Sequence, residues 1–295
     1  MSKIGFFISG ILFYLPESFR YLLSWILTFT FFDLFRLRRT VMLENIKRAM
    51  PQLTLEQQIK IVRKHVFYIF YNFLEFCIFP HINEKWIKKN IIFDDISSLE
   101  IALKEGGALL LALHLGHGDM AISMLSHRGL PMFVISKHFK YKWLNDFWFG
   151  TRKKFGAQFI DPHGRNTSFD ILKALKNKNA VIFVQDQYMG PPYGVETKFF
   201  GIDTGTACGL ALFSLKTARP VIPVYCYRDD KRRTHIVSLE RVSLDHEKEV
   251  GQTREQILID RTQFYNSILE KIITQYPDQW LWIHRRWKKY WSDLP

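Results

Sequence analysis

The chain has 295 residues, enough for one large α/β domain or two small ones, and either size buries a substantial core. Hydrophobic residues make up 47% of the chain and aromatic residues 16%, more than an ordinary soluble domain uses, which implies apolar surface beyond a core. Lys and Arg exceed Asp and Glu by 41 to 28, and the net charge of +13 favours phosphates, anionic bilayers or acidic proteins as partners.

The three cysteines, Cys77, Cys208 and Cys226, are widely spaced and form no CxxC pair. This argues against a disulfide framework or a zinc site, so we expect a reducing environment and small buried thiols.

The amino-terminal segment carries two uncharged runs, residues 4–16 and 21–32, separated by Glu17 and Arg20. Each run is shorter than the roughly 20 residues that a spanning helix needs. We predict a membrane anchor over residues 1–40, either one imperfect span or two short helices in one leaflet. A secretory signal and a buried helix pair of a soluble protein are the alternatives. The basic cluster that follows predicts that the rest of the chain stays cytoplasmic; it comprises Arg36, Arg38, Arg39, Lys47 and Arg48.

The body of the chain, residues 41–295, is predicted to form one catalytic domain. A capping box at Thr54–Gln57 predicts the start of a long amphipathic helix. Short apolar runs then alternate with helix-length stretches, which predicts an α/β fold with a mostly parallel central sheet flanked by helices. These runs are residues 108–113, 132–135, 180–184 and 221–225.

The first of these strands ends at a polar, glycine-rich turn that carries His114 and Asp119. Strand ends of open α/β sheets are where sites form. We expect Asp119 to reach back to His114 and fix its tautomer, giving a His/carboxylate dyad without a serine nucleophile. Such a dyad suits an alcohol substrate that attacks an activated acyl carbonyl.

Other readings of the same turn stay open. Residues 116–121 also satisfy G-x-G-x-x-A between a strand and a helix, which is typical of an NADP-binding oxidoreductase. A metal hydrolase would use His114, His117 and Asp119. A basic membrane-binding or nucleic-acid-binding protein without catalysis would explain the charge and the aromatic content, but not the dyad.

Four motifs, in order along the chain, resemble those of the lysophospholipid acyltransferase superfamily and, within it, of the bacterial lipid A late acyltransferases. They are His114 to Asp119, Arg152 to Gly156 with FIDPHGR behind it, AVIFVQDQ ending at Gln187, and Arg219 to Val224. The closing LWIHRRWK, residues 281–288, is similar to the family's carboxyl-terminal signature.

The resemblance implies His114 as general base, with Asp119, Arg152 and Asp186 as the other catalytic residues and Arg165 and Gln187 as substrate-binding residues. It implies no cofactor, no metal and no nucleic acid. The donor is expected to be acyl carrier protein or acyl-coenzyme A, and the acceptor a phosphorylated glycolipid or another lipid. The place of action is expected to be the cytoplasmic face of a bacterial inner membrane that is anionic.

Two departures from the family pattern concern the acceptor. The family more often has a bulky aromatic residue where this chain has His117 and Gly118, and many lipid A enzymes carry Glu where Asp119 stands.

The carboxyl-terminal tryptophans lie among cations, which predicts either a lipid-interface position or a partly buried helix with a basic face. They are Trp280, Trp282, Trp287 and Trp291.

Overall fold

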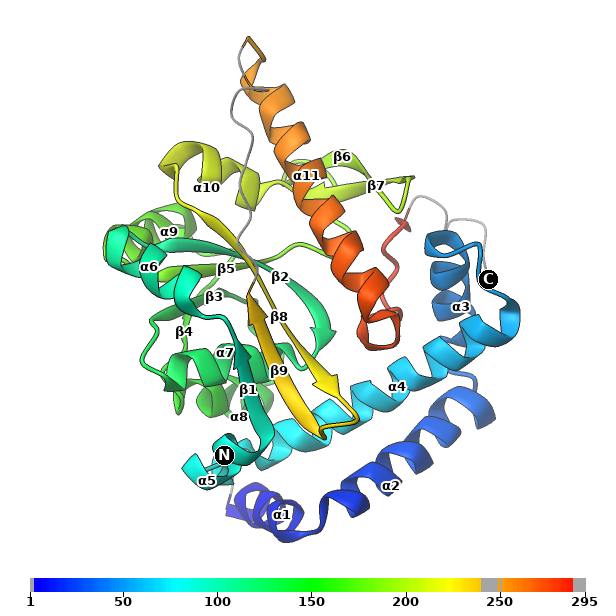
Figure 1. The fold of residues 1–295 in the computed structure, drawn as a ribbon. Helices are drawn as coiled ribbons and strands as arrows, with labels where there is room; N and C mark the ends of the chain where they lie inside the picture. The colour runs from blue at the N-terminus through cyan, green and yellow to red at the C-terminus, as the bar shows by residue number, and fades with distance from the viewer. Residues whose placement is uncertain (1–2, 240–248, 250, 289–295) are drawn as a thin grey trace.

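The computed structural model describes residues 3–239, 249 and 251–288. Its centre is a seven-stranded sheet with the order β1-β9-β8-β2-β5-β3-β4 (Figure 1). All neighbouring strands run parallel except β8 and β9, which confirms the predicted mostly parallel sheet. The strands are β1 (Ile91–Asp94), β2 (Ala108–Gly116), β3 (Met132–Ile135), β4 (Gln158–Ile160), β5 (Ala180–Val184), β8 (Val221–Asp229) and β9 (Thr234–Leu239).

Strand β2 lies in the middle of the sheet, between β5 and β8. Residues 108–113 are all buried because helices cover both faces, as is typical of continuous apolar runs in parallel sheets. Its alternate side chains enter two separate cores, Leu109 and Leu111 on one face and Leu110 on the other.

The helices divide between these two faces. The face of Leu109 packs against α9 (Thr167–Lys176), α10 (Gly209–Thr217) and α11 (Arg254–Gln275). The face of Leu110 packs against α5 (Glu84–Asn90), α6 (Ser97–Glu105) and α7 (Gly118–His127), with α8 (Lys142–Lys153) at its margin. A separate hairpin, β6 (Gly194–Phe199) and β7 (Ile202–Ala207), contacts α11.

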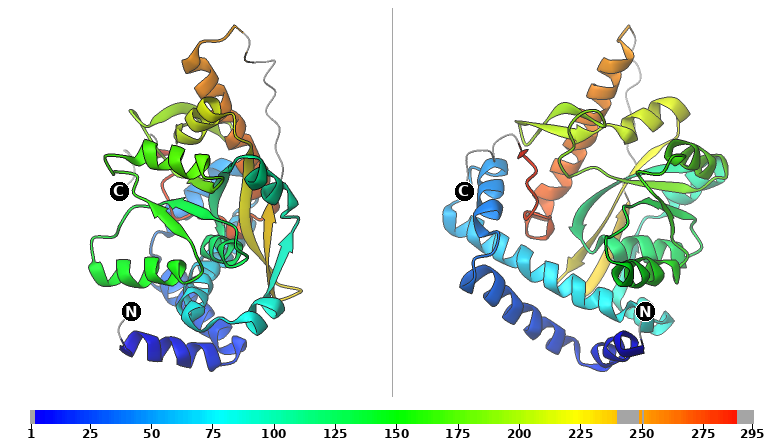
Figure 2. Two further views of the ribbon diagram at one scale, coloured as in Figure 1. Left: turned by 90° about the vertical axis from the view of Figure 1, so that its left-hand side faces the viewer. Right: turned by 180° about the vertical axis from the view of Figure 1, so that it is seen from behind.

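The amino-terminal helices form an additional layer. The predicted long helix is α4 (Leu55–Ile78), and the Thr54–Gln57 capping box at its start is confirmed. Figures 1 and 2 show α4 crossing beside the sheet, with α1 (Lys3–Tyr14) and α2 (Glu17–Thr28) along its outer side. The remaining segments are the π-helical η1 (Phe29–Leu34), α3 (Arg39–Ala49) and the single turn η2 (Phe79–His81).

The predicted anchor over residues 1–40 is interrupted at Pro16, so α1 and α2 have 12 residues each. Among the residues that the structure describes, no helix has both the length and the apolar character to cross a bilayer. The single imperfect span is therefore not supported.

The carboxyl-terminal segment follows α11 through the turn η4 (Pro277–Gln279) and packs into the core. Trp280, Trp282 and Trp287 are at most 1% exposed, and each indole N–H donates a hydrogen bond within the protein. The lipid-interface position predicted for these three residues is therefore wrong, because their apolar rings complete the core beside β2. Trp291 lies outside the described residues.

Candidate active site

His114 lies where β2 loses its regular pairing with β8. Ala112 pairs with Val224 and Gly116 pairs with Cys226, so three residues of β2 stand opposite one residue of β8. Such bulges bend a strand and redirect a side chain. The His114 side chain is 43% exposed although the strand residues before it are buried, so its imidazole is accessible at the edge of the sheet.

Asp186 is the partner of this imidazole. The residue follows β5, the neighbour of β2, and its side chain is only 1% exposed. Asp186 Oδ1 lies 2.8 Å from His114 Nδ1, and Asp186 Oδ2 accepts a hydrogen bond from the His114 backbone N–H at 3.0 Å. A carboxylate at Nδ1 fixes the tautomer with the proton on Nδ1 and leaves Nε2 free to accept a proton.

The electrostatics of the pair favour the charged forms of both groups. Burial alone lowers the pKa of His114, but the charge and hydrogen bond of Asp186 outweigh it and the pKa is raised. Burial raises the pKa of Asp186, yet the charge of His114 and the hydrogen bonds from His114 and Trp280 hold it below its usual range. His114 is therefore a stronger base than a free imidazole.

Asp119 does not take the position expected for it. It lies in the first turn of α7 and forms an ion pair with Arg152 of α8, whose side chain is 10% exposed. Contrary to the expectation, Asp119 does not directly fix the His114 tautomer, because Asp186 occupies Nδ1. Asp119 and Arg152 still act on His114 through space, since the first raises its pKa and the second lowers it.

The two predicted substrate-binding residues differ in their placement. Gln187 follows Asp186, and its Nε2 atom lies 3.4 Å from Nδ1 and 3.5 Å from Nε2 of His114. Arg165 is exposed in the loop between β4 and α9. The structure thus brings Gln187 to the imidazole and leaves Arg165 on the surface.

Several groups that hold the site in place were missed by sequence reasoning. Trp280 Nε1 donates to Asp186 Oδ2 at 2.8 Å, and the Leu281 N–H donates to the His114 carbonyl oxygen at 3.0 Å. Asn72 of α4 donates to the Gly116 carbonyl oxygen at 2.7 Å. The LWIHRRWK motif begins at Leu281, directly after Trp280, but no local signal connects this segment with a strand more than 160 residues earlier.

The glycine-rich turn has structural reasons of its own. Gly116 has φ +56, and a Cβ atom there would lie 2.0 Å from the Cys226 carbonyl oxygen. Glycine is thus required by the close approach of β8, whether or not a pyrophosphate binds. His117 is 3% exposed and accepts a hydrogen bond from the Met120 N–H, so it caps α7. Over the described ranges, no group of three or more His, Cys, Asp or Glu side chains is arranged to hold a metal ion.

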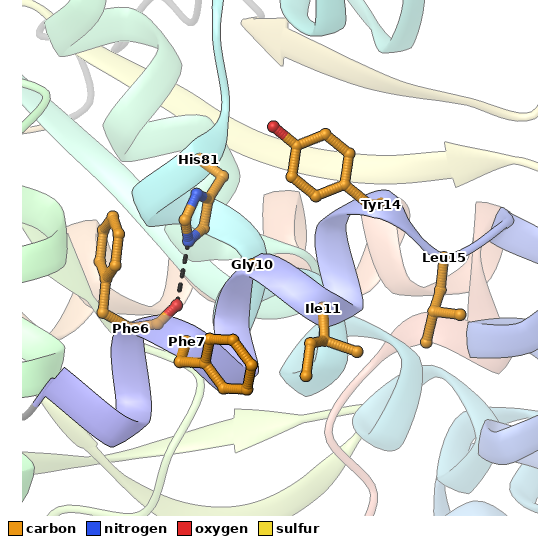
Figure 3. Close-up of a pocket in the computed structure, with 7 residues that line it drawn as sticks. All are labelled: Phe6, Phe7, Gly10, Ile11, Tyr14, Leu15 and His81. Carbon is orange, nitrogen blue, oxygen red and sulfur yellow. Dashed lines mark hydrogen bonds between the residues drawn. The ribbon is translucent and has the colours of Figure 1, made fainter.

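An apolar groove of about 690 Å³ lies elsewhere, along α1 (Figure 3). Its lining includes the exposed rings of Phe6, Phe7 and Tyr14, together with His81, whose Nε2 lies 3.2 Å from the Phe6 carbonyl oxygen. None of the predicted catalytic residues lines it.

Comparison with known proteins gives one family. The model described as bacterial lipid A biosynthesis acyltransferase matches residues 2–289. The chain is 31% identical over 126 residues to the lipid A biosynthesis palmitoleoyltransferase of Escherichia coli (strain K12), and equally to the lipid A biosynthesis acyltransferase of Shigella flexneri. Each alignment covers 42% of this chain and 39% of the relative, so it spans less than half of either protein.

Proposed function

The chain belongs to the bacterial lipid A biosynthesis acyltransferase family, and on that premise we propose that it transfers a fatty acyl group from an acyl thioester to a hydroxyl group of a lipid A precursor. The observation that carries the proposal is the His114–Asp186 pair at the end of the central strand. A half-exposed imidazole whose Nδ1 is held by a buried carboxylate is suited to general-base catalysis.

The reaction needs no nucleophile from the protein. His114 Nε2 removes the proton of the acceptor hydroxyl while its oxygen attacks the thioester carbonyl carbon. The C–S bond breaks as the ester forms, and the imidazolium returns its proton to the departing thiolate sulfur. The sequence contains no G-x-S-x-G motif, which agrees with direct transfer without an acyl-enzyme.

Three further residues have proposed roles in this step. Asp186 stabilises the imidazolium that forms on His114. Gln187 lies close enough to the imidazole to orient a bound hydroxyl. Arg152, oriented by Asp119, supplies positive charge near the carbonyl oxygen as it becomes an oxyanion.

The charge of the protein suits both proposed substrates. A net charge of +13 attracts acyl carrier protein, which is acidic, and acyl-coenzyme A is the alternative donor. The same positive field attracts a phosphorylated glycolipid acceptor, and Arg165 is an exposed guanidinium for such a phosphate.

The amino-terminal layer is proposed to lie in the membrane surface without crossing it. Large apolar side chains are exposed along α1, α2 and η1, including Phe7 at 69% and Leu22 at 58%. Arg36 and Arg38 are exposed directly after them, where cations meet anionic head groups. This arrangement is proposed to hold the catalytic domain at the cytoplasmic face of the inner membrane.

Transfer of labelled acyl groups from acyl carrier protein to a panel of lipid A precursors tests the proposal. We expect His114→Ala to lower the rate by about 10³-fold, because a general base contributes about 10² to 10⁴-fold. His127→Ala is the matched control, since this imidazole is also paired with a carboxylate, that of Glu84, but on the surface. Equal rates for wild type and His114→Ala would contradict the mechanism.

A further inference from the structure

We infer that Trp280 is a positioning residue of the active site, whose indole N–H holds the Asp186 carboxylate in the orientation that His114 requires. Trp280 lies in the carboxyl-terminal segment, 94 residues after Asp186, and is 1% exposed. The effect on turnover rests on the proposed function, whereas the effect on the imidazole can be measured without it.

The hydrogen bonds around Asp186 leave its carboxylate a single orientation. Oδ2 accepts from Trp280 Nε1 at 2.8 Å and from the His114 backbone N–H at 3.0 Å. Oδ1 is thereby turned toward His114 Nδ1, at 2.8 Å. Two donors on one oxygen prevent the carboxylate from rotating away, which is the usual way in which a buried charged group is held.

The backbone beside the indole is attached to the same strand. Trp280 forms a bridge with Leu115, and the Leu281 N–H donates to the His114 carbonyl oxygen at 3.0 Å. The segment therefore contacts both members of the pair, Asp186 through a side chain and His114 through the backbone. Trp280 acts through Asp186, because its indole donates only to the carboxylate and not to the imidazole.

The chain offers a matched control in Trp282. This residue is 0% exposed and packs edge-to-face against Trp280, with 4.6 Å between the ring centroids. Its Nε1 donates to the Pro277 carbonyl oxygen at 2.6 Å, away from the His114–Asp186 pair. Trp280→Phe and Trp282→Phe thus each remove one indole donor from the same core, and only the first removes it from Asp186.

The direction of the effect follows from the groups around His114. Among the described residues, the charged or titratable groups that act on His114 are Asp186, Asp119, Arg152 and His284. Trp280→Phe removes none of them, but it frees the Asp186 carboxylate to rotate away from Nδ1. The charge and hydrogen bond that raise the pKa of His114 are then weakened, so this pKa falls and the acid limb of the kcat/KM profile moves to lower pH.

The experiment compares wild type, Trp280→Phe and Trp282→Phe in kcat, KM and the pH dependence of kcat/KM. Trp280→Phe is expected to lower kcat by about tenfold, the effect of one hydrogen bond to a charged group, with KM within about twofold. Its acid limb moves to lower pH, while Trp282→Phe keeps the wild-type limb. An unchanged limb in Trp280→Phe, or the same change in both variants, would overturn the inference.

Proton NMR separates this inference from the proposed function. The downfield Nδ1–H signal of His114, assigned by its loss in His114→Ala, is expected to shift in Trp280→Phe and not in Trp282→Phe. If wild type shows no acyl transfer but this signal behaves as stated, the proposed function fails and the positioning inference holds. If the signal is the same in all three proteins, the inference fails whatever the activity.

Discussion

At the residue scale, the proposed activity depends on which carboxylate stabilises the imidazolium of His114. Asp186 contacts Nδ1 directly, whereas Asp119 forms an ion pair with Arg152 and acts on His114 only through space. In the proposed mechanism the two acids therefore make separable contributions: Asp186 orients the imidazole and acts on its charge, and Asp119 places the Arg152 guanidinium.

Asp186→Asn is expected to cost about 10³-fold in kcat, because an amide in this position supports the wrong tautomer. The acid limb of kcat/KM moves to lower pH, since the charge that raises the pKa of His114 is lost and burial then lowers it. Asp119→Asn is expected to lower kcat by only about tenfold and to move the acid limb of kcat/KM by less than Asp186→Asn does. A pH profile of both variants checks this, and a larger shift in Asp119→Asn would contradict it.

The sequence motifs marked residues that lie close together in the structure, but not how they pair. The motifs identified His114, Asp119, Arg152, Asp186 and Gln187, and four of these join in two direct pairs. The pairing was wrong for Asp119 because five residues of separation suggested a local contact. The actual contact spans 72 residues and depends on β2 and β5 being neighbours.

At the element scale, the bulge at the end of β2 is what exposes His114. Three features hold it: the register change against β8, the left-handed backbone of Gly116, and the hydrogen bond from Asn72 of α4 to the Gly116 carbonyl oxygen. The site is thus built on the rigid central strand and not on a loop.

Gly116→Ala is expected to lower the free energy of unfolding by about 3 kcal/mol, because its Cβ atom meets the Cys226 carbonyl oxygen and its φ disfavours side chains. Gly118→Ala is the matched control, since a Cβ atom there meets nothing within 4 Å. Urea unfolding of both variants measures the difference. Equal stability of the two variants would contradict this expectation and show that the backbone of β8 can move away from a Cβ atom at position 116.

The elements differed in how far the sequence predicted them. The four apolar runs became β2, β3, β5 and β8, and the capping box fixed the start of α4, because local patterns determine both. The short strands β1 and β4 and the hairpin β6–β7 were not predicted. Three or four residues carry little periodicity, and the two threonines and the glycine of β7 are typical of a turn.

At the scale of the whole molecule, apolar surface is concentrated on the amino-terminal layer. Phe7, Tyr14, Leu22 and Phe35 of this layer are between 58% and 83% exposed. The helices α1 and α2 of the layer lie on the side of α4 that faces away from the sheet (Figure 1). Aromatic residues lie both on this surface and in the carboxyl-terminal core. The composition alone does not tell which of them are exposed and which are buried.

The double variant Phe7→Ser/Tyr14→Ser is expected to reduce binding to vesicles of phosphatidylethanolamine and phosphatidylglycerol by at least about tenfold, because burial of each ring contributes about 2 kcal/mol. Phe169→Ser is the matched control, since this ring is 65% exposed but lies on α9. Vesicle flotation provides the measurement. Undiminished binding of the double variant, or equal loss in the control, would contradict membrane attachment through α1.

The contact between Trp280 and Asp186 also sets an order of events during synthesis on the ribosome. His114 and Asp186 lie on neighbouring strands and are synthesised first, whereas the indole donor is added only with the last part of the described chain. A nascent or prematurely terminated polypeptide that stops before Trp280 carries His114 and Asp186 without the indole that we infer to orient them. On the proposed function, such truncated products would be poor acyltransferases, so activity would be acquired only after the carboxyl-terminal segment has been made.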